Sequence, residues 1–298
     1  MQLDKTRIAV RERTQVELMD LSLHVLRAYG GRLLVAMLVG ALPLAILNYF
    51  LIGWMASPEF YDFGSSFIPF RYVWTMSLLV FLEAPWGSMF ATMYLGLAVF
   101  EERPTWREVL LGVGRSSLPT IVCLALLRGP VIAWLLLVPA WEEPDFTPFE
   151  FWVILLAGGV AIVRGIRTFL PEVILLEQNP WRSKNPLVMT LPRRMTLLHA
   201  TQNTALFPRW LIIAAMTVVL TGAVAHGFLF LAGIFLHDWR WGPLLVHVGV
   251  PSAMWLVACY VTVVRFLSYL DTRIRNEGWE VELRLRAEAT RFQTRVTG

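Results

Sequence analysis

The chain has few charged residues and very few cysteines for its length. Charged side chains make up 16% of its 298 residues, against about 25% in a typical soluble domain. Because 56% of the residues are hydrophobic, this composition excludes an ordinary water-soluble surface. The two cysteines, Cys123 and Cys259, are too few for a disulfide framework or a cysteine-rich metal site. We expect both to pack as small apolar side chains inside helices.

Six long apolar stretches dominate what is present. Each is long enough to cross a hydrocarbon core about 30 Å thick, which takes about 20 helical residues. The first stretch is too long for the apolar region of a cleavable signal peptide. We therefore expect an all-α polytopic membrane protein with six transmembrane helices. The predicted spans are Leu33–Met55, Tyr72–Ala98, Leu118–Ala140, Phe151–Leu170, Trp210–Leu236 and Pro243–Phe266.

Positive charge is concentrated in alternate segments between these stretches. Nearly all of the 26 Lys and Arg residues lie before the first stretch, in the second and fourth loops, or after the sixth. The first, third and fifth loops are acidic instead. Because Lys and Arg stay on the cytoplasmic side, we predict that both termini are cytoplasmic. The basic residues flank the membrane rather than form one soluble patch, so we expect no nucleic-acid partner.

The predicted cytoplasmic segments carry signals for helix starts. Thr14 to Glu17 and Thr105 to Glu108 have the spacing of capping boxes. Asn185-Pro186 supplies an N-cap with proline at the first helical position. Basic amphipathic helices lie among lipid headgroups, so we expect cytoplasmic interfacial helices that contact anionic lipids or simply connect the hairpins. The chain then divides into a cytoplasmic N-terminal helix (1–32), a six-helix transmembrane domain (33–267) and a cytoplasmic C-terminal helix (268–298).

Arginines at the cytoplasmic ends of the fourth and fifth stretches predict a basic surface. Arg164 and Arg167 interrupt the end of the fourth stretch on one helical face, where long side chains reach back to the headgroups. A helix that projects into the cytosol would place them equally well. Arg193 and Arg194 precede the fifth stretch. We expect these four side chains to face anionic lipids.

The C-terminal tail has an apolar stripe with helical periodicity. Pairs of opposite charge four residues apart, such as Asp271 and Arg275, support a helix there. We expect this helix to pack on the cytoplasmic loops or to bind a partner protein. The residues of this partner face are Leu270, Ile274, Val281, Leu285 and Phe292.

Two charged residues fall near the predicted middle of the membrane. Glu83 lies in the second stretch and Arg128 in the third, at about 15–17 Å depth by helical rise. Each precedes a proline by two residues, and Pro85 and Pro130 are expected to kink their helices. Three interpretations stay open: a buried ion pair that fixes the helix register, a substrate or proton pathway, or two charges that do not pair.

Sites for cofactors and metals are not expected. His226, His237 and His247 lie toward the outer side of the last two stretches, but their spacing fits no metal motif. The sequence also contains no P-loop, dinucleotide fingerprint or serine-hydrolase elbow. We therefore predict no cofactor, no metal and no catalytic residue.

Four segments carry a family resemblance. Asp20–Arg27, Val173–Glu177, Arg193–Leu197 and, most closely, Tyr269–Gly278 resemble a bacterial group that includes the glycerophosphoryl diester phosphodiesterase membrane domain. The resemblance covers most of the chain. That membrane domain also occurs without its catalytic partner, and this sequence holds no phosphodiesterase domain. The resemblance implies a location in a bacterial cytoplasmic (inner) membrane and a multi-pass helical architecture, without an enzymatic activity.

These observations favour a non-catalytic scaffold or accessory subunit that acts through its cytoplasmic face. Anionic lipids and a protein bound at the C-terminal helix are the expected partners. The alternative is a transporter or lipid-handling protein that uses Glu83 and Arg128, and the third possibility is an intramembrane enzyme. A polar cavity that reached Glu83 would favour transport, and an evenly packed interior would favour the scaffold.

Overall fold

The computed structural model describes residues 14–59, 68–99, 104–181, 189–200 and 203–277. Within these ranges the chain is helical and contains no β-strand, so the predicted all-α class is confirmed. Four helices are each long and apolar enough to cross a membrane. Two further pairs of bent helices raise the count to six if each pair is one span. The four are Val16–Ala56, Pro148–Ile166, Trp210–Leu236 and Leu245–Arg273.

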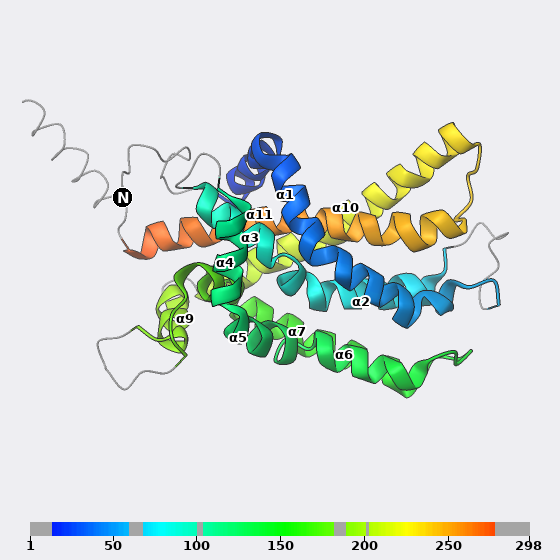
Figure 1. The fold of residues 1–298 in the computed structure, drawn as a ribbon, viewed down its shortest axis with the longest axis horizontal. Helices are drawn as coiled ribbons and strands as arrows, with labels where there is room; N and C mark the ends of the chain where they lie inside the picture. Colours follow the sequence, from blue (N-terminus) through cyan, green and yellow to red (C-terminus); the bar gives the residue numbers. More distant parts are fainter. Residues whose placement is uncertain (1–13, 60–67, 100–103, 182–188, 201–202, 278–298) are drawn as a thin grey trace, which may run out of the picture.

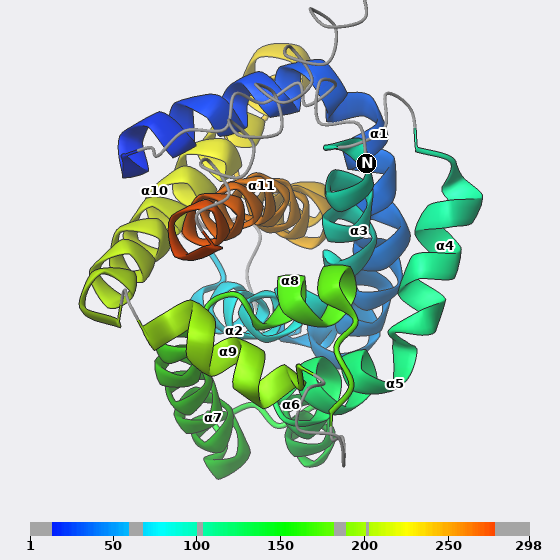
Figure 2. The same cartoon turned by 90° about the vertical axis from the view of Figure 1, so that its left-hand side faces the viewer.

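The first span belongs to one long helix, α1 (Gln15–Ile52). The Thr14 hydroxyl accepts a hydrogen bond from the backbone N–H of Glu17, and the Glu17 carboxylate accepts one from the N–H of Thr14. This predicted capping box is therefore present. The helix passes residues 32 and 33 without a break, and Figures 1 and 2 show its N-terminal part bending across one end of the bundle.

The second span is bent. Helix α2 (Phe70–Gly87) meets α3 (Met89–Ala98) at an angle of 40°. Pro85 lies inside α2, close to its end, and removes a backbone donor there. The kink predicted at Pro85 is thus part of a bend that is completed at Ser88.

The third predicted span, Leu118–Ala140, is not a continuous helix. Gly129 has φ +86°, a left-handed conformation that glycine adopts without a Cβ clash, and Pro130 then starts a new helix at its first position. Arg128 therefore lies in a break between helical pieces, where a kinked helix was expected. Its pieces are α5 (Ser117–Thr120), the π-helical segment Ile121–Leu126, α6 (Pro130–Leu137) and the 3₁₀ turn Val138–Ala140, and α4 (Trp106–Arg115) precedes them.

The remaining helices differ strongly in burial. In the candidate span that includes most of α11 (Val250–Glu277), 72% of the apolar window is buried. The corresponding share is 6% for the candidate span in α10 (Asn203–Leu236). Figure 2 shows α11 in the interior of the bundle and α10 at its edge. Since α10 exposes mainly apolar side chains, its outer face suits contact with lipid. The other helices are α7 (Pro148–Ile166), α8 (Leu170–Glu172) and α9 (Leu191–Ala200).

A short segment fills one end of the bundle, and we call it the plug (residues 170–177). It consists of α8 and the π-helical turn Val173–Glu177. Its residues from Pro171 to Leu175 are buried, and Figure 2 shows α8 inside the ring of surrounding helices. Phe169, at its start, joins a second core cluster with Met195 of α9 and Tyr269 of α11. The plug therefore links the predicted fourth and fifth spans through the interior of the bundle.

Candidate functional site

Glu83 is fully buried and is bound by two neutral donors. The side-chain amide of Asn48 donates to one carboxylate oxygen and the indole N–H of Trp134 to the other, both at 2.8 Å. These donors come from α1 and α6, so Glu83 connects three helices. The salt bridges of the described residues do not include a pair between Glu83 and Arg128. Of the three interpretations from sequence, the ion pair is therefore not formed in this structure.

Arg128 lies instead in a cluster of arginines around Glu172. The Arg265 guanidinium donates to Glu172, which is fully buried. Arg128 is 3% exposed and donates to the backbone carbonyl of Arg167 at 3.0 Å. Its charge is attracted by Glu172 and repelled by Arg265. We call Arg128, Arg164, Arg265 and Glu172 the arginine cluster.

Arg164 completes the cluster from α7. Its guanidinium donates to the carbonyl of Leu82 at 3.0 Å and lies 4.1 Å from the ring centre of Phe81, both on α2. A guanidinium over an aromatic face makes a favourable cation–π contact. The side chain is half-buried, and the charges of Arg128 and Arg265 both repel it. The sequence missed this cluster because its members come from distant segments.

A half-buried carboxylate, Glu177, lies at the C-terminal end of the plug. It accepts hydrogen bonds from the guanidinium of Arg194 and from the Tyr269 hydroxyl, the latter at 2.6 Å. Burial would raise the pKa of Glu177, but these bonds and the charges of Arg194 and Arg273 hold it below its ordinary value. Arg265 and Tyr269 stand one helical turn apart on α11, so α11 holds both ends of the plug.

A cavity of about 570 Å³ opens beside the plug, and we call it the large cavity. Its walls are mostly apolar and come from α3, α4, the plug and α11. Arg115 and Arg273 contribute positive charge to its lining, and Glu108 contributes negative charge. The Gln178 side chain lies between the carbonyls of Gly112 and Leu175, each at 3.4 Å. An apolar chamber with a few charged groups suits an amphiphilic ligand.

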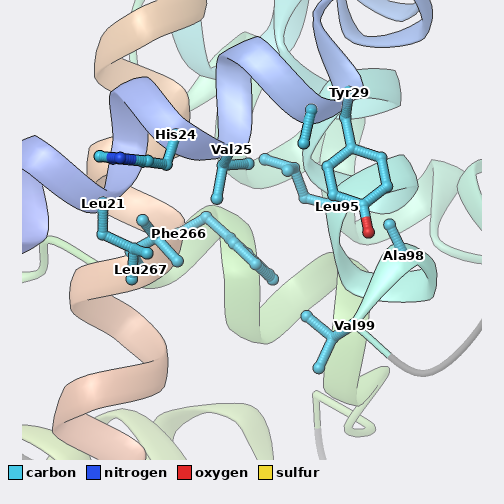
Figure 3. A pocket seen from close by; sticks show the side chains of 10 residues that line it. Leu21, His24, Val25, Tyr29, Leu95, Ala98, Val99, Phe266 and Leu267 are labelled. Atoms are coloured by element: carbon cyan, nitrogen blue, oxygen red, sulfur yellow. The ribbon is translucent and has the colours of Figure 1, made fainter. Parts of the chain in front are cut away.

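A separate, smaller apolar cavity of about 230 Å³ lies next to the large cavity, and Phe266 lines both. Figure 3 shows its walls formed by the N-terminal part of α1, by α3 and by α11, with Phe266 projecting between them. Val99 and Phe266 line both cavities, so the two chambers share a wall. We call this one the small cavity. Glu83 lines neither chamber.

The four arginines predicted to form a basic surface separate into two pairs. Arg167 and Arg193 are exposed, as that interpretation requires. Arg164 and Arg194 point into the protein and bind Leu82 and Glu177. For this second pair, contacts within the chain replace the headgroup contacts expected from the sequence.

The predicted partner face of the tail is only partly described. Helix α11 continues past residue 268 and is described as far as Glu277, so it crosses the expected domain boundary. Leu270 is half-buried and packs against both core clusters. Ile274 lies in α11. Three members of the face and the N-cap predicted in the fourth loop lie outside the described residues, namely Val281, Leu285, Phe292 and Asn185-Pro186.

At the N-terminal end of α2, Arg71 forms a bidentate ion pair with Glu150. The same guanidinium donates to the carbonyls of Glu143 and Pro144 and lies 5.1 Å from the Trp54 ring centre. Thr147 and Glu150 also form a capping box at the start of α7. The spacing of these two residues, like that of the other capping boxes, could have indicated this helix start.

The three histidines lie apart in aromatic surroundings. His247 packs against the rings of Tyr49 and Tyr72, and His226 against Trp241. His237 has φ +56° in the turn after α10. In the described part of the chain, no three histidine, cysteine or carboxylate side chains gather as they would around a metal ion.

Comparison of the chain with protein-family models, curated proteins and solved structures finds no match. The resemblance to the glycerophosphoryl diester phosphodiesterase membrane domain group therefore stays a prediction from sequence. The geometry of the chain's own residues is what supports a function.

Proposed function

We propose that the chain is a lipid-handling protein of a bacterial cytoplasmic membrane, with six spans and both termini in the cytoplasm. In this proposal the two cavities hold an anionic lipid at the cytoplasmic end. The observation that carries it is that the two chambers are adjacent and share Val99 and Phe266 in their linings. An apolar chamber of about 230 Å³ meets a larger one whose lining includes Arg115 and Arg273.

Chemistry and location agree with this ligand. Apolar walls favour acyl chains, and arginine binds phosphate through several donors at once. The large cavity is lined by parts of α4, the plug and the end of α11, which flank the apolar spans and belong to the segments predicted to be cytoplasmic. Anionic lipids give the cytoplasmic leaflet a negative surface potential that attracts such residues. The proposal includes no catalytic step and no cofactor.

Filling the small cavity tests the proposal. Ala28 lines it but is exposed, so Ala28→Trp should occupy the space without displacing a core side chain. In reconstituted vesicles, spin-labelled phosphatidylglycerol should then associate about fivefold more weakly relative to phosphatidylcholine. Val35→Trp is the matched control, because Val35 is 47% exposed on the same helix and lines neither cavity. Equal lipid selectivity in the two variants would contradict the proposal.

A scaffold or accessory subunit is the second candidate. Helix α4 favours it, because Leu110 and Leu111 are 54% and 51% exposed on a helix predicted to face the cytoplasm. Affinity purification of the full chain, of a chain without residues 278–298 and of Leu110→Ser tests this role. If the same partners copurify with both altered chains, docking through the tail and α4 would be excluded.

A further inference from the structure

The arginine cluster carries more positive than negative charge in a buried place. Arg265 binds Glu172, Arg128 is attracted by it, and Arg164 lies near both arginines. Three positive charges and one negative charge leave two positive charges unbalanced within the cluster. Uncompensated charges inside a protein or membrane cost several kcal/mol unless a partner offsets them. The fold therefore has a reason to recruit an anion to this position.

Each arginine also has a buried N–H group without a hydrogen-bond partner. These groups are Nε of Arg128, Nε of Arg164 and Nη2 of Arg265. They come from the break in the third predicted span, from α7 and from α11. Buried donors are nearly always satisfied, and guanidinium groups match the oxygens of an oxyanion. A ligand with several acceptor oxygens would satisfy donors that the described chain leaves unused.

We propose that the arginine cluster is a binding site for a phosphate-type dianion. Two negative charges neutralise the cluster, which neither a chloride ion nor a single carboxylate can do. Arg265 has a side-chain exposure of 14% and Arg164 is half-buried, so these two side chains are partly open to their surroundings. The phosphate group can be free in solution or belong to a lipid headgroup. The site differs from the two cavities, whose linings include none of the three arginines.

Binding of labelled inorganic phosphate to the purified chain in an uncharged detergent tests the site. The pH is set where phosphate is a dianion, and sulfate and chloride are compared at matched ionic strength. Phosphate and sulfate should bind and raise the melting temperature, and chloride should do neither. Arg128→Gln should weaken phosphate binding about tenfold, which corresponds to about 1.4 kcal/mol. Arg240→Gln is the control, because Arg240 is exposed in the loop after α10.

Glu172→Gln separates a binding site from a merely structural cluster. This substitution removes the competing negative charge, so phosphate should bind more tightly than to the wild type and should stabilise the variant more. If neither variant folds, the comparison of phosphate with chloride on the wild-type chain still tests the proposal. A second arm adds vesicles that contain phosphatidic acid: competition with inorganic phosphate identifies a site that also accepts headgroups, and no competition identifies free phosphate as the ligand.

Equal effects of phosphate and chloride would overturn the proposal. So would unchanged phosphate affinity in both Arg128→Gln and Glu172→Gln. Lipid selectivity measured with Ala28→Trp is independent of these results, so failure of this site and failure of the lipid-handling proposal are distinguishable.

Discussion

Glu83 and Glu172 are both fully buried, yet their surroundings are opposite. Glu83 is held by an amide and an indole, and no salt bridge of the described residues includes it. Glu172 is bound by Arg265 and faces the charge of Arg128. Removing the charge of Glu83 deletes no ion pair, whereas removing that of Glu172 leaves guanidinium groups without a counter-charge. Burial alone therefore does not reveal the role of a carboxylate in this bundle.

The largest effect is expected for Glu172→Gln. Breaking a buried ion pair by removing one partner costs about 3–5 kcal/mol, and here it leaves three arginines together. Unfolding of the purified protein in mixed detergent micelles measures this loss. The double variant Glu172→Leu with Arg265→Leu should recover part of it, because both members of the pair are removed. A loss below about 1 kcal/mol in the single variant would show that the cluster does not need its carboxylate.

Gly129→Ala should destabilise the protein by about 1–3 kcal/mol, because it strains the break that positions Arg128. Gly129 has φ +86°, and a Cβ there would lie 3.1 Å from Leu156. Gly158→Ala is the matched control in α7, where a Cβ meets nothing within 4 Å. The control should be neutral or stabilising by about 0.5–1 kcal/mol, since alanine favours helix. Equal unfolding free energies for the two variants would disprove strain at the break.

Glu177 lies between the two extremes and supplies a pH test. Burial raises the pKa of Glu177 in the folded protein, but the hydrogen bonds from Arg194 and Tyr269 outweigh burial and lower it. An unfolded glutamate titrates at about 4.3. The stabilisation is therefore complete above the unfolded pKa and is lost as the pH falls through the lowered folded pKa. Unfolding measured across this acid range should show the free energy of unfolding falling as the pH falls. Arg194→Gln should reduce this loss, and an unchanged acid dependence would contradict the assignment.

The smallest effect is expected for Glu83→Gln, within about 1 kcal/mol of the wild type. The amide keeps the shape of the side chain, and its oxygen can still accept from Trp134. Its NH₂ group would face Asn48, whose Oδ1 has no partner and can accept after the Asn48 amide flips. The same unfolding assay measures both substitutions. A loss as large as that of Glu172→Gln would erase the contrast between the two carboxylates.

Local signals predicted local structure well. The capping boxes at Thr14 and Thr105 are present because they depend only on residues three apart. The fifth predicted stretch, Trp210–Leu236, is a candidate span within the longer helix α10, and the two have the same C-terminal bound. The prediction of one continuous helix in the third span was wrong. Gly129 adopts a left-handed conformation and α6 starts at Pro130, and these local features outweigh apolar composition. Hydropathy measures average composition and does not register a single left-handed residue.

The candidate site was harder to predict. Helical rise placed Glu83 and Arg128 at similar depth, but depth along an axis does not fix direction around it. Arg128 donates to the carbonyl of Arg167 and is attracted by Glu172. Glu83 accepts hydrogen bonds from Asn48 and Trp134. The plug could not be anticipated, because its burial depends on contacts with α9 and α11 far along the chain. From the sequence, only the residue types Glu and Arg indicated these places, which the structure shows to be buried.

The most direct test of lipid handling combines Arg115→Gln with Arg273→Gln, the two arginines of the large cavity. The measurement is the association of spin-labelled phosphatidylglycerol and phosphatidylcholine with the reconstituted protein, with Arg240→Gln as the control. We expect phosphatidylglycerol to lose about tenfold in association while phosphatidylcholine is unchanged, which corresponds to about 1.4 kcal/mol for the charged headgroup. Equal losses for both lipids, or the same selectivity as in Arg240→Gln, would contradict the proposal.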